Sequence, residues 1–314
     1  MAKVSICIPA YRDARGVERL LKSISGSDYR DIEVIITDDT PDTSVAEVAD
    51  RFKDSFDLTY HHNAEPLGPA GNWNRSIDMS SGEYIKIMHQ DDWFTYPDSL
   101  SRYVRMLDEH PEAVLAYSGS RQVTVTDAED QDGSPAEYYD RCISDEHRKL
   151  IEDDWRGIYV GQYIGAPSAT IYRRSDLRFD PALKWLIDAD FYMGLLQNGG
   201  QMVCSCDPLV SIGISSGQMT NDCADSKEVN LREYKHVFRK FDLGGSEACR
   251  YKLADICVSF RGRYSDISDC GITRQEYAKV LKPYRRDLRA FYFDLILRKL
   301  HIRKSDHSSV ERFA

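Results

Sequence analysis

The chain has 314 residues, of which 42% are hydrophobic and 29% charged, so it can bury one large core and still carry an appended segment. A formal net charge of −10 disfavours nucleic acid as a partner and disfavours broad attraction to an anionic membrane. The first apolar stretch ends at Pro9, too early for a signal peptide, and no run reaches the roughly 20 apolar residues of a membrane span. We therefore expect a cytoplasmic protein with reduced thiols, because its eight cysteines are irregularly spaced.

The first half of the chain alternates β-rich runs with segments of helical periodicity. Strands are predicted at residues 4–8, 33–37, 58–61 and 84–88. Helices are predicted at residues 17–25, 45–52 and 73–79. This alternation indicates βα units around a mainly parallel sheet.

The second half of the chain has a different order of predicted elements. Pro97 favours a helix start, and the helical pattern runs through Leu107. Residues 126–137 are rich in Asp, Gly and Pro and predict an exposed excursion. Further strands are predicted at residues 113–117, 168–172 and 202–204, with helices at 186–196 and from about 229 onward.

Pairs of acids follow two of the predicted strands. Asp38 and Asp39 follow the second strand, and Asp91 and Asp92 follow the fourth. The carboxyl ends of parallel strands line the ligand crevice of an open sheet, so these acids should share one edge. Adjacent carboxylates raise each other's pKa, and Mg²⁺ or Mn²⁺ relieves that repulsion. Asp91 and Asp92 therefore suit a metal site, although one of them could instead cap the next helix or start a turn.

Two further segments suit a nucleotide. Asp38 and Asp39 could accept a hydrogen bond from a nucleobase N–H, or they could form the turn that begins the next helix. The glycine-containing run at residues 68–72 permits close backbone approach at a helix start, which suits a phosphate or ribose, although such runs are often plain loops.

Taken in order, these segments resemble glycosyltransferase family 2, the inverting enzymes of GT-A fold. The resemblance rests on residues 4–11, 33–39, Gly68, Asn74, 82–85 and 90–93, and it continues through 165–168, 172–174, 179–180 and 188–191. It implies a Rossmann-like, mainly parallel sheet flanked by helices, followed here by a C-terminal helical extension. It also implies a nucleotide-binding set of Pro9, Ala10, Tyr11, Asp38, Asp39, Gly68, Asn74, Gln90 and Asp91.

The resemblance assigns the chemistry as well. Asp91 and Asp92 fall at the family's acidic metal motif, which implies Mn²⁺ or Mg²⁺. The family pattern often has a further Asp two positions before Asp91, where this chain has His89, so His89 could share the ribose and metal duties. Asp188 matches the general base that takes the proton of the acceptor hydroxyl. Asp190 is its rival, and the alternative for Asp188 is a helix cap.

The acceptor side is less defined. Trp93 and Trp185 could stack on an acceptor sugar, although aromatic residues more often fill cores. The stretch 218–220 matches a loop that closes over the diphosphate in some relatives, and it lacks a histidine that could bind metal. The basic end of the chain at residues 298–304, preceded by aromatic and aliphatic residues, could lie against a membrane that presents a lipid-linked acceptor, or it could end a packed helix.

We therefore predict a metal-dependent glycosyltransferase of the hexosyltransferase type. Residues 1–120 would bind the nucleotide-sugar, 121–225 would form the acceptor half of the same catalytic domain, and 226–314 would form the helical extension. We expect a UDP-sugar as donor, a glycan or lipid-linked acceptor and a role in cell-surface polysaccharide synthesis. A catalytically silent carbohydrate- or nucleotide-binding scaffold and a sugar nucleotidyltransferase remain the alternatives.

Overall fold

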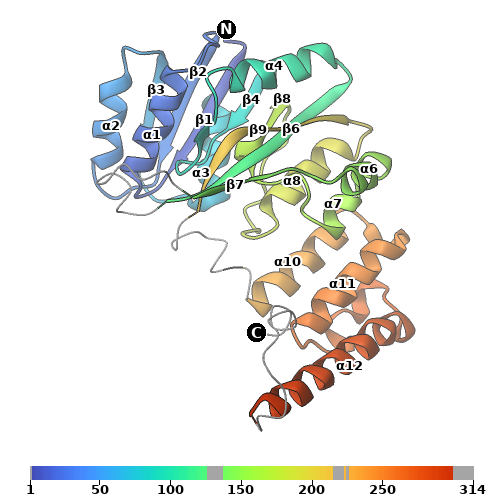
Figure 1. Ribbon diagram of the computed structural model, residues 1–314. Coiled ribbons are helices and arrows are strands. Elements are labelled where there is room, and N and C mark those ends of the chain that lie inside the picture. Colours follow the sequence, from blue (N-terminus) through green and yellow to red (C-terminus); the bar gives the residue numbers. More distant parts are fainter. Residues whose placement is uncertain (1, 126–136, 215–222, 224–225, 300–314) are drawn as a thin grey trace. The chain divides into compact units, whose positions relative to one another are not determined.

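The computed structural model of the protein describes residues 2–125, 137–214, 223 and 226–299, with side chains up to residue 287 and at 289. The chain divides into two compact units, Met1–Asp225 and Ser226–Ala314 (Figure 1). The strands of the first unit are β1 (Val4–Ala10), β2 (Ile32–Asp38), β3 (Asp57–His62), β4 (Tyr84–Ile87), β5 (Trp93–Phe94), β6 (Ala113–Thr124), β7 (Tyr138–Arg141), β8 (Thr170–Arg173) and β9 (Gln201–Ile214). Its helices are α1 (Ala14–Ser25), α2 (Ser44–Phe52), α3 (Gly68–Met79), α4 (Ser99–Glu109), α6 (Asp145–Asp153), α7 (Gly157–Val160), η1 (Pro167–Ala169) and α8 (Ile187–Leu196).

One sheet forms the centre of this unit, with the strand order β3-β2-β1-β4-β8-β6-β9-β5 and with β7 paired to β6. Strands β3, β2, β1 and β4 are parallel neighbours, as the alternation of strands and helices predicted. The second half of the sheet is mixed, because β8 runs antiparallel to both β4 and β6 while β9 runs parallel to β6. The predicted α/β fold with a flanked sheet is confirmed.

Helices cover both faces of the parallel strands, which explains why β1 is apolar and buried along its whole length. Ile6 and Ile8 belong to a core cluster with buried residues of α1, α2 and α4. Cys7, between them, faces the other way and contacts Ser76 of α3. On α1, Val17, Leu20, Leu21 and Ile24 are buried at helical spacing.

The polar elements of the unit differ most from the sequence prediction. Helix α3 begins at Gly68, five residues before the predicted start, and β6 and β9 extend well beyond the predicted strands. Strands β5 and β7 and helices α6 and α7 were not predicted at all. These elements are short or polar, and β7 is exposed at every position, so no hydrophobic periodicity marks them.

A disulfide joins Cys142, directly after β7, to Cys206 in β9. Strand β6 pairs with both β7 and β9, and this pairing brings the two Cα atoms to 5.2 Å although the residues are 64 positions apart. The expectation of reduced thiols is therefore wrong for this pair. Among the described residues, no other disulfide is formed.

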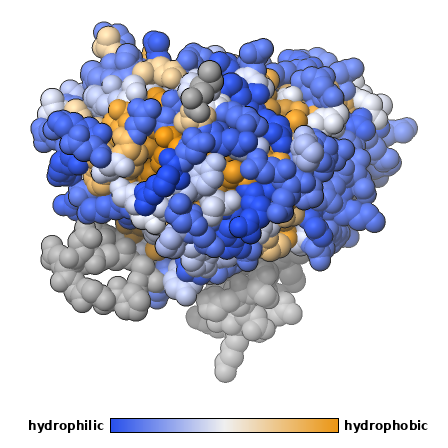
Figure 2. Space-filling model, turned by 90° about the horizontal axis from the view of Figure 1, so that it is seen from above, coloured by the Kyte–Doolittle hydropathy of each residue, from blue (hydrophilic) through white to orange (hydrophobic). Residues whose placement is uncertain are grey.

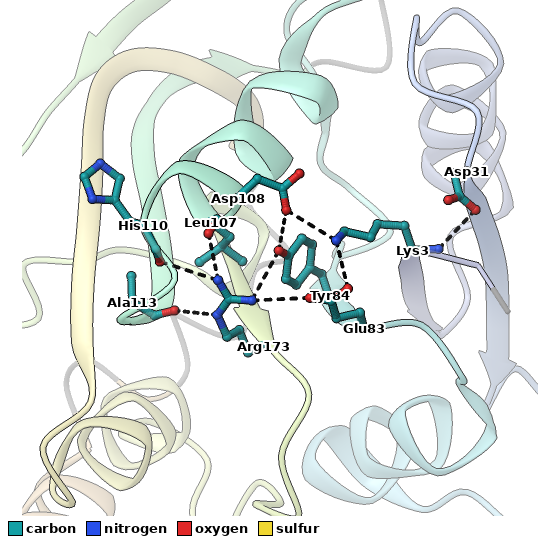
Figure 3. Close-up of polar contacts among 9 residues, drawn as sticks. All are labelled: Lys3, Asp31, Glu83, Tyr84, Leu107, Asp108, His110, Ala113 and Arg173. Atoms are coloured by element: carbon teal, nitrogen blue, oxygen red, sulfur yellow. Dashed lines mark hydrogen bonds and ion pairs between the residues drawn. The ribbon is translucent and has the colours of Figure 1, made fainter.

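A polar network ties the sheet together at the amino ends of β1 and β4 (Figure 3). The Lys3 ammonium lies 2.8 Å from Glu83 and 3.3 Å from Asp108 at the end of α4. The Arg173 guanidinium donates to the carbonyl oxygen of Leu107 at 2.7 Å. These contacts fix the edge of the sheet opposite to the strand ends that carry the predicted acids.

The second unit is helical and contains α10 (Lys227–Lys240), α11 (Glu247–Ser259) and α12 (Arg274–Lys299), with the single turns η2 (Leu243–Gly245), η3 (Tyr264–Asp266) and η4 (Ser268–Cys270). Within the described ranges, no helix has the length and apolar character needed to cross a bilayer.

Hydrophilic side chains cover most of the face shown in Figure 2, and hydrophobic residues form smaller patches between them. The basic residues predicted to contact a membrane, 298–304, lie outside the residues whose side chains are described.

Candidate functional site

The candidate site lies where β1, β2 and β4 end on the same edge of the sheet. The parallel register sets Ala10 opposite Asp38, and Cys7 opposite Ile87, so the loops that follow these strands start side by side. The predicted strand-end residues are thus brought to one edge, as expected for an open parallel sheet.

Three potential metal ligands gather after β4. One ligand atom each from His89, Asp91 and Asp92 lies within 4.8 Å of the others, and this is the one such group among the described residues. Asp92 is 1% exposed and accepts hydrogen bonds from the Gly213 N–H at 3.2 Å and from the Ser168 hydroxyl. Burial raises the pKa of Asp92, and the negative charge of Asp91 raises it further.

The donor set fits a divalent cation. Burial lowers the pKa of His89, which favours the neutral imidazole that can bind a metal. The His89 Nε2 atom is buried and has no hydrogen-bond partner among the described residues. Two close carboxylates and an imidazole nitrogen with unused bonding capacity are costly to bury without a cation.

The two acids are held differently. The described residues donate no hydrogen bond to the carboxylate of Asp91, whereas its carbonyl oxygen accepts one from Arg19 at 2.9 Å. The Arg19 guanidinium also lies 4.1 Å from the centre of the Trp93 ring. Asp91 therefore has both carboxylate oxygens available, while the Asp92 carboxylate is already fixed by the protein.

A buried lysine lies behind this cluster and was not predicted. Lys86, in the middle of β4, is fully buried and donates to the carbonyl oxygens of Ser168 and Thr170. Burial lowers the pKa of Lys86 strongly, and the nearby charge of Asp92 opposes that effect. The one available signal was a lysine inside an otherwise apolar four-residue strand.

The loop after β1 is fastened to the loop after β4. The Gln90 side chain accepts from the Tyr11 N–H at 2.6 Å and donates to the Tyr11 carbonyl at 2.8 Å. The next residue, Arg12, has a φ of 59° and donates its N–H to the Thr40 hydroxyl at 2.8 Å. Tyr11 remains 48% exposed, so its ring is accessible at this edge of the sheet.

Asp38 and Asp39 organise the loops after β2 and β3. The fully buried Asp38 carboxylate accepts from the Thr40 N–H and the Tyr60 hydroxyl, both at 2.8 Å. Asp39 accepts from the backbone N–H groups of Leu67 and Gly68 at the start of α3. The contact of Asp38 with the Thr40 N–H is a local turn, as the alternative expected, whereas Asp39 contacts α3 and not the helix that follows in the chain. Nucleobase recognition by these acids stays a prediction.

Asn74 makes contacts of a structural kind. Its side-chain amide donates to the carbonyl of Phe179 and accepts from the N–H of Phe179, each at 2.8 Å. Both functional groups of the amide are thereby used to hold α3 against a distant segment. A nucleotide contact by Asn74 is not tested by this geometry and stays a prediction.

Asp188 lies in the first turn of α8, whose N-cap position is Leu186, and its carboxylate accepts a hydrogen bond from the Ala189 N–H at 2.7 Å. This contact satisfies a backbone donor of the first turn, as the helix-cap alternative expects, and the role of Asp188 as a base stays a prediction. Burial raises the pKa of Asp188 to about 6. A short segment connects α8 to the acid cluster, because Tyr192 donates to the Gly165 carbonyl at 3.1 Å and His89 donates its N–H to the Ser168 hydroxyl at 2.9 Å.

The rival acid and the tryptophans have distinct settings. Asp190, in the same turn as Asp188, is 2% exposed. Trp93 and Trp185 are partly buried, and stacking of either on an acceptor stays a prediction. Trp73, which was not predicted, packs its ring 4.8 Å from the His89 ring. The predicted loop at 218–220 lies outside the described residues.

Comparisons of the sequence with a family model and with known proteins indicate the same family. The model of Glycosyl transferase family 2 matches residues 5–179. A GalNAc(5)-diNAcBac-PP-undecaprenol beta-1,3-glucosyltransferase of Campylobacter jejuni is 33% identical over 94 residues, which cover 29% of this chain and 30% of the relative. Abequosyltransferase RfbV of Salmonella typhimurium is 31% identical over 116 residues, covering 36% of this chain and 34% of the relative. These two alignments thus span about a third of each relative.

Solved structures share the fold at low sequence identity. TarS residues 1–349 of S. aureus, solved in complex with UDP-GlcNAc, has a TM-score of 0.60 at 17% identity, and the match covers 89% of this chain and 79% of that solved chain. The mannosyltransferase PcManGT of Pyrobaculum calidifontis, in complex with GDP-Man and Mn²⁺, has a TM-score of 0.55 at 13% identity, with coverage of 91% and 80%. Because the family model matches more than half of the chain, and the architecture is that of these structures, the protein belongs to glycosyl transferase family 2.

Proposed function

We propose that the protein is a metal-dependent, inverting glycosyltransferase that moves a sugar from a nucleotide-diphosphate sugar to a glycan or lipid-linked acceptor. The observation that carries this proposal is the cluster of His89, Asp91 and Asp92 at the carboxyl end of β4. Family membership over residues 5–179 supports the reaction class.

Asp91 is the preferred direct ligand in this proposal, because the protein leaves its carboxylate without a donor within the described residues. Asp92, held by the Gly213 N–H, and His89 complete the set. A bound Mn²⁺ or Mg²⁺ would neutralise the charge that develops on the leaving diphosphate. The Mn²⁺ in the PcManGT complex supports a divalent ion in this fold.

Asp188 is the proposed general base. A pKa of about 6 leaves the carboxylate ionised at neutral pH yet makes it a stronger base than an ordinary aspartate. The acceptor oxygen would bond to the anomeric carbon as its proton passes to Asp188 and the bond to the diphosphate breaks. Asp190 is the alternative base.

The donor is proposed to be a UDP-sugar, bound by Pro9, Ala10, Tyr11, Asp38, Asp39, Gly68, Asn74, Gln90 and Asp91. The UDP-GlcNAc complex of TarS supports UDP, while the GDP-Man complex of PcManGT shows that the same fold also accepts another base. The named activities of the Campylobacter and Salmonella relatives support a glycan or lipid-linked acceptor, with Trp93 and Trp185 as contacts and a role in cell-surface polysaccharide synthesis. Peripheral membrane contact through residues 298–304 belongs to the same proposal.

Thermal unfolding with UDP, GDP and dTDP, each with and without Mn²⁺, tests the site. We expect one nucleotide to raise the melting temperature only when Mn²⁺ is present, because a ligand of the native state stabilises it by mass action. Asp91→Asn should abolish that rise, and Asp78→Asn, on the exposed side of α3, should retain it. A shift that survives in Asp91→Asn would contradict the assignment of the metal ligand, and no shift with any nucleotide would favour the silent scaffold.

A further inference from the structure

The charge of the protein is divided unevenly between its two units. The first unit, residues 1–225, has 21 Lys and Arg against 39 Asp and Glu, a formal net charge of −18. The second unit, residues 226–314, has 20 Lys and Arg against 12 Asp and Glu, a net charge of +8. The overall value of −10 therefore conceals a basic unit. The proposed nucleotide and metal site lies in the first unit and does not explain the positive charge of the second.

Helix α10 displays part of this positive charge on one face. Its other face is buried in the second unit through Asn230, Glu233, Tyr234, Val237 and Phe238. The outward residues recur at the spacing of a single helix face. They line a hollow of about 470 Å³ and are Arg232, His236, Arg239 and Lys240.

Two carboxylates of the second unit pair with basic side chains on this face of α10. Asp269 pairs with Arg239 and, at 3.2 Å, with Lys235. The buried Glu233 accepts from Arg232 at 3.1 Å. The hollow itself is lined by three permanent cations, Arg232, Arg239 and Lys240, together with His236. The side chains of Arg232 and Arg239 remain 54% and 53% exposed, so both guanidinium groups can still donate to a ligand.

The position of the charges on the helix is informative. Cations in the last turn of a helix are favoured by its dipole, which accounts for Arg239 and Lys240. Arg232 and His236 lie in the preceding turns, where the dipole offers no such advantage. Their alignment with the last-turn cations around one hollow therefore calls for another explanation.

We propose that this hollow binds a phosphate-bearing ligand with at least two negative charges, such as a diphosphate or a phosphodiester. The planar guanidinium groups offer paired N–H donors that match phosphate oxygens, and Lys240 adds a compact charge. The hollow is large enough for a diphosphate and part of the group attached to it. All the residues lie in the second unit, so the proposal does not rest on the proposed transferase reaction.

Binding to the full-length protein tests the proposal, with inorganic pyrophosphate measured by calorimetry and with phosphatidylglycerol vesicles measured by co-sedimentation. Both assays are run without divalent metal, which keeps the ligands from the acidic cluster of the first unit. The test variant is Arg232→Gln combined with Lys240→Gln. The matched control, Lys279→Gln combined with Arg286→Gln, removes the same charge from the same unit outside the hollow.

We expect the wild-type chain to bind at least one probe and the test variant to bind it roughly 25-fold more weakly, about fivefold for each basic residue. In the control variant, the affinity for the same probe should fall by less than about threefold. Pyrophosphate binding would indicate a soluble phosphate compound, and vesicle binding alone would indicate a lipid headgroup; either supports the proposal when the test variant loses it. Equal losses in both variants, or no binding of either probe by the wild type, would overturn it.

Discussion

Asp188 has to be ionised to accept a proton, and its pKa of about 6 sets the pH range in which it can act. We predict that kcat/KM falls as the pH drops through about 6, since the protonated carboxyl cannot serve as the base. Asp188→Asn should lower kcat by about 10² to 10⁴ while nucleotide binding is retained. Asp190→Asn is the matched comparison, and a larger loss of kcat in that variant would transfer the role to Asp190.

The same raised pKa has a consequence for stability. A carboxyl whose folded pKa lies above its unfolded value favours the folded state most when it is protonated, so this contribution is lost as the pH rises from about 4 towards 6. We therefore predict that Asp188→Asn is more stable than the wild type at pH 7, by about 1 to 2 kcal/mol, and that the difference shrinks at pH 5. Chemical denaturation at the two pH values measures it, and an equal or larger difference at pH 5 would contradict the assigned pKa.

Arg19 contacts the loop after β4, which carries the proposed metal ligands, through the Asp91 carbonyl and the Trp93 ring. Groups that orient metal ligands typically contribute 10- to 100-fold to metal affinity. We predict that Arg19→Met raises the Mn²⁺ concentration for half-maximal nucleotide-dependent stabilisation by about tenfold. Arg15→Met, at an exposed position of the same helix, should leave it unchanged. Equal behaviour of the two variants would show that Arg19 does not position the loop.

Part of the site could be predicted from single residues and part could not. The acids at 38–39 and 91–92 follow apolar strands directly, so the sheet pattern alone predicted that they would share an edge. Arg19, Trp73 and Gly213 reach the same loop from α1, α3 and β9, and such long-range packing leaves no local pattern. The loop contacts of Asp38 and Asp39 were not predictable in detail, because their partners include residues from distant parts of the chain.

At the scale of elements, Gly213 of β9 lies against the loop after β4, which carries the proposed metal ligands. A Cβ atom added there would lie 2.5 Å from the carbonyl oxygen of Asp91, and the Gly213 N–H donates to Asp92. We predict that Gly213→Ala lowers stability by about 1 to 3 kcal/mol and weakens metal-dependent nucleotide binding, because the loop must shift. Gly244→Ala, where an added Cβ meets no atom within 4 Å, is the control for both measurements. If Gly213→Ala changed neither the stability nor the metal-dependent nucleotide binding, β9 and the loop after β4 would not be in contact there.

The link between Cys142 and Cys206 fastens β7 to β9. A cross-link that closes a loop of 64 positions restricts the unfolded chain, so its removal typically costs about 2 to 4 kcal/mol. We predict a loss of this size for Cys142→Ser under non-reducing conditions, measured by denaturant unfolding. Cys204→Ser, two positions from Cys206 in β9, should leave the stability nearly unchanged. Equal losses of stability in the two variants would argue against the disulfide.

The elements differ in how far the sequence predicts them. Strands β1, β2 and β4 and helices α1 and α2 follow from apolar runs and helical spacing, because each buries apolar side chains in the core. Strand β3 has no fully buried residue, and its signal is the alternation that packs Leu58 and Tyr60 against the core. Strands β5 and β7 are recognisable only through their partners β9 and β6, since two residues or an entirely exposed strand carry no periodic signal. The disulfide depends on the pairing of β6 with β7 and β9, so it too could not be predicted from the sequence pattern.

At the scale of the whole molecule, the two units have opposite charge, −18 and +8. An acidic catalytic unit raises the local concentration of divalent cations, which suits a site built from Asp91, Asp92 and His89. It also repels an anionic donor, so donor binding should depend on a bound metal that neutralises the carboxylates of the cluster. The sequence predicted the helical character of the second unit, but the overall net charge concealed this division.

Release of a nucleoside diphosphate from a nucleotide-sugar tests the central claim most directly. The purified chain is incubated with Mn²⁺ and, in turn, with UDP-glucose, UDP-galactose, UDP-GlcNAc and GDP-mannose, and the products are followed by NMR. We predict that one donor yields the free diphosphate by slow transfer to water, that the released sugar first appears with the inverted anomeric configuration, and that Asp91→Asn abolishes the reaction. Bound nucleotide without any release, or release with retained configuration, would contradict an inverting glycosyltransferase.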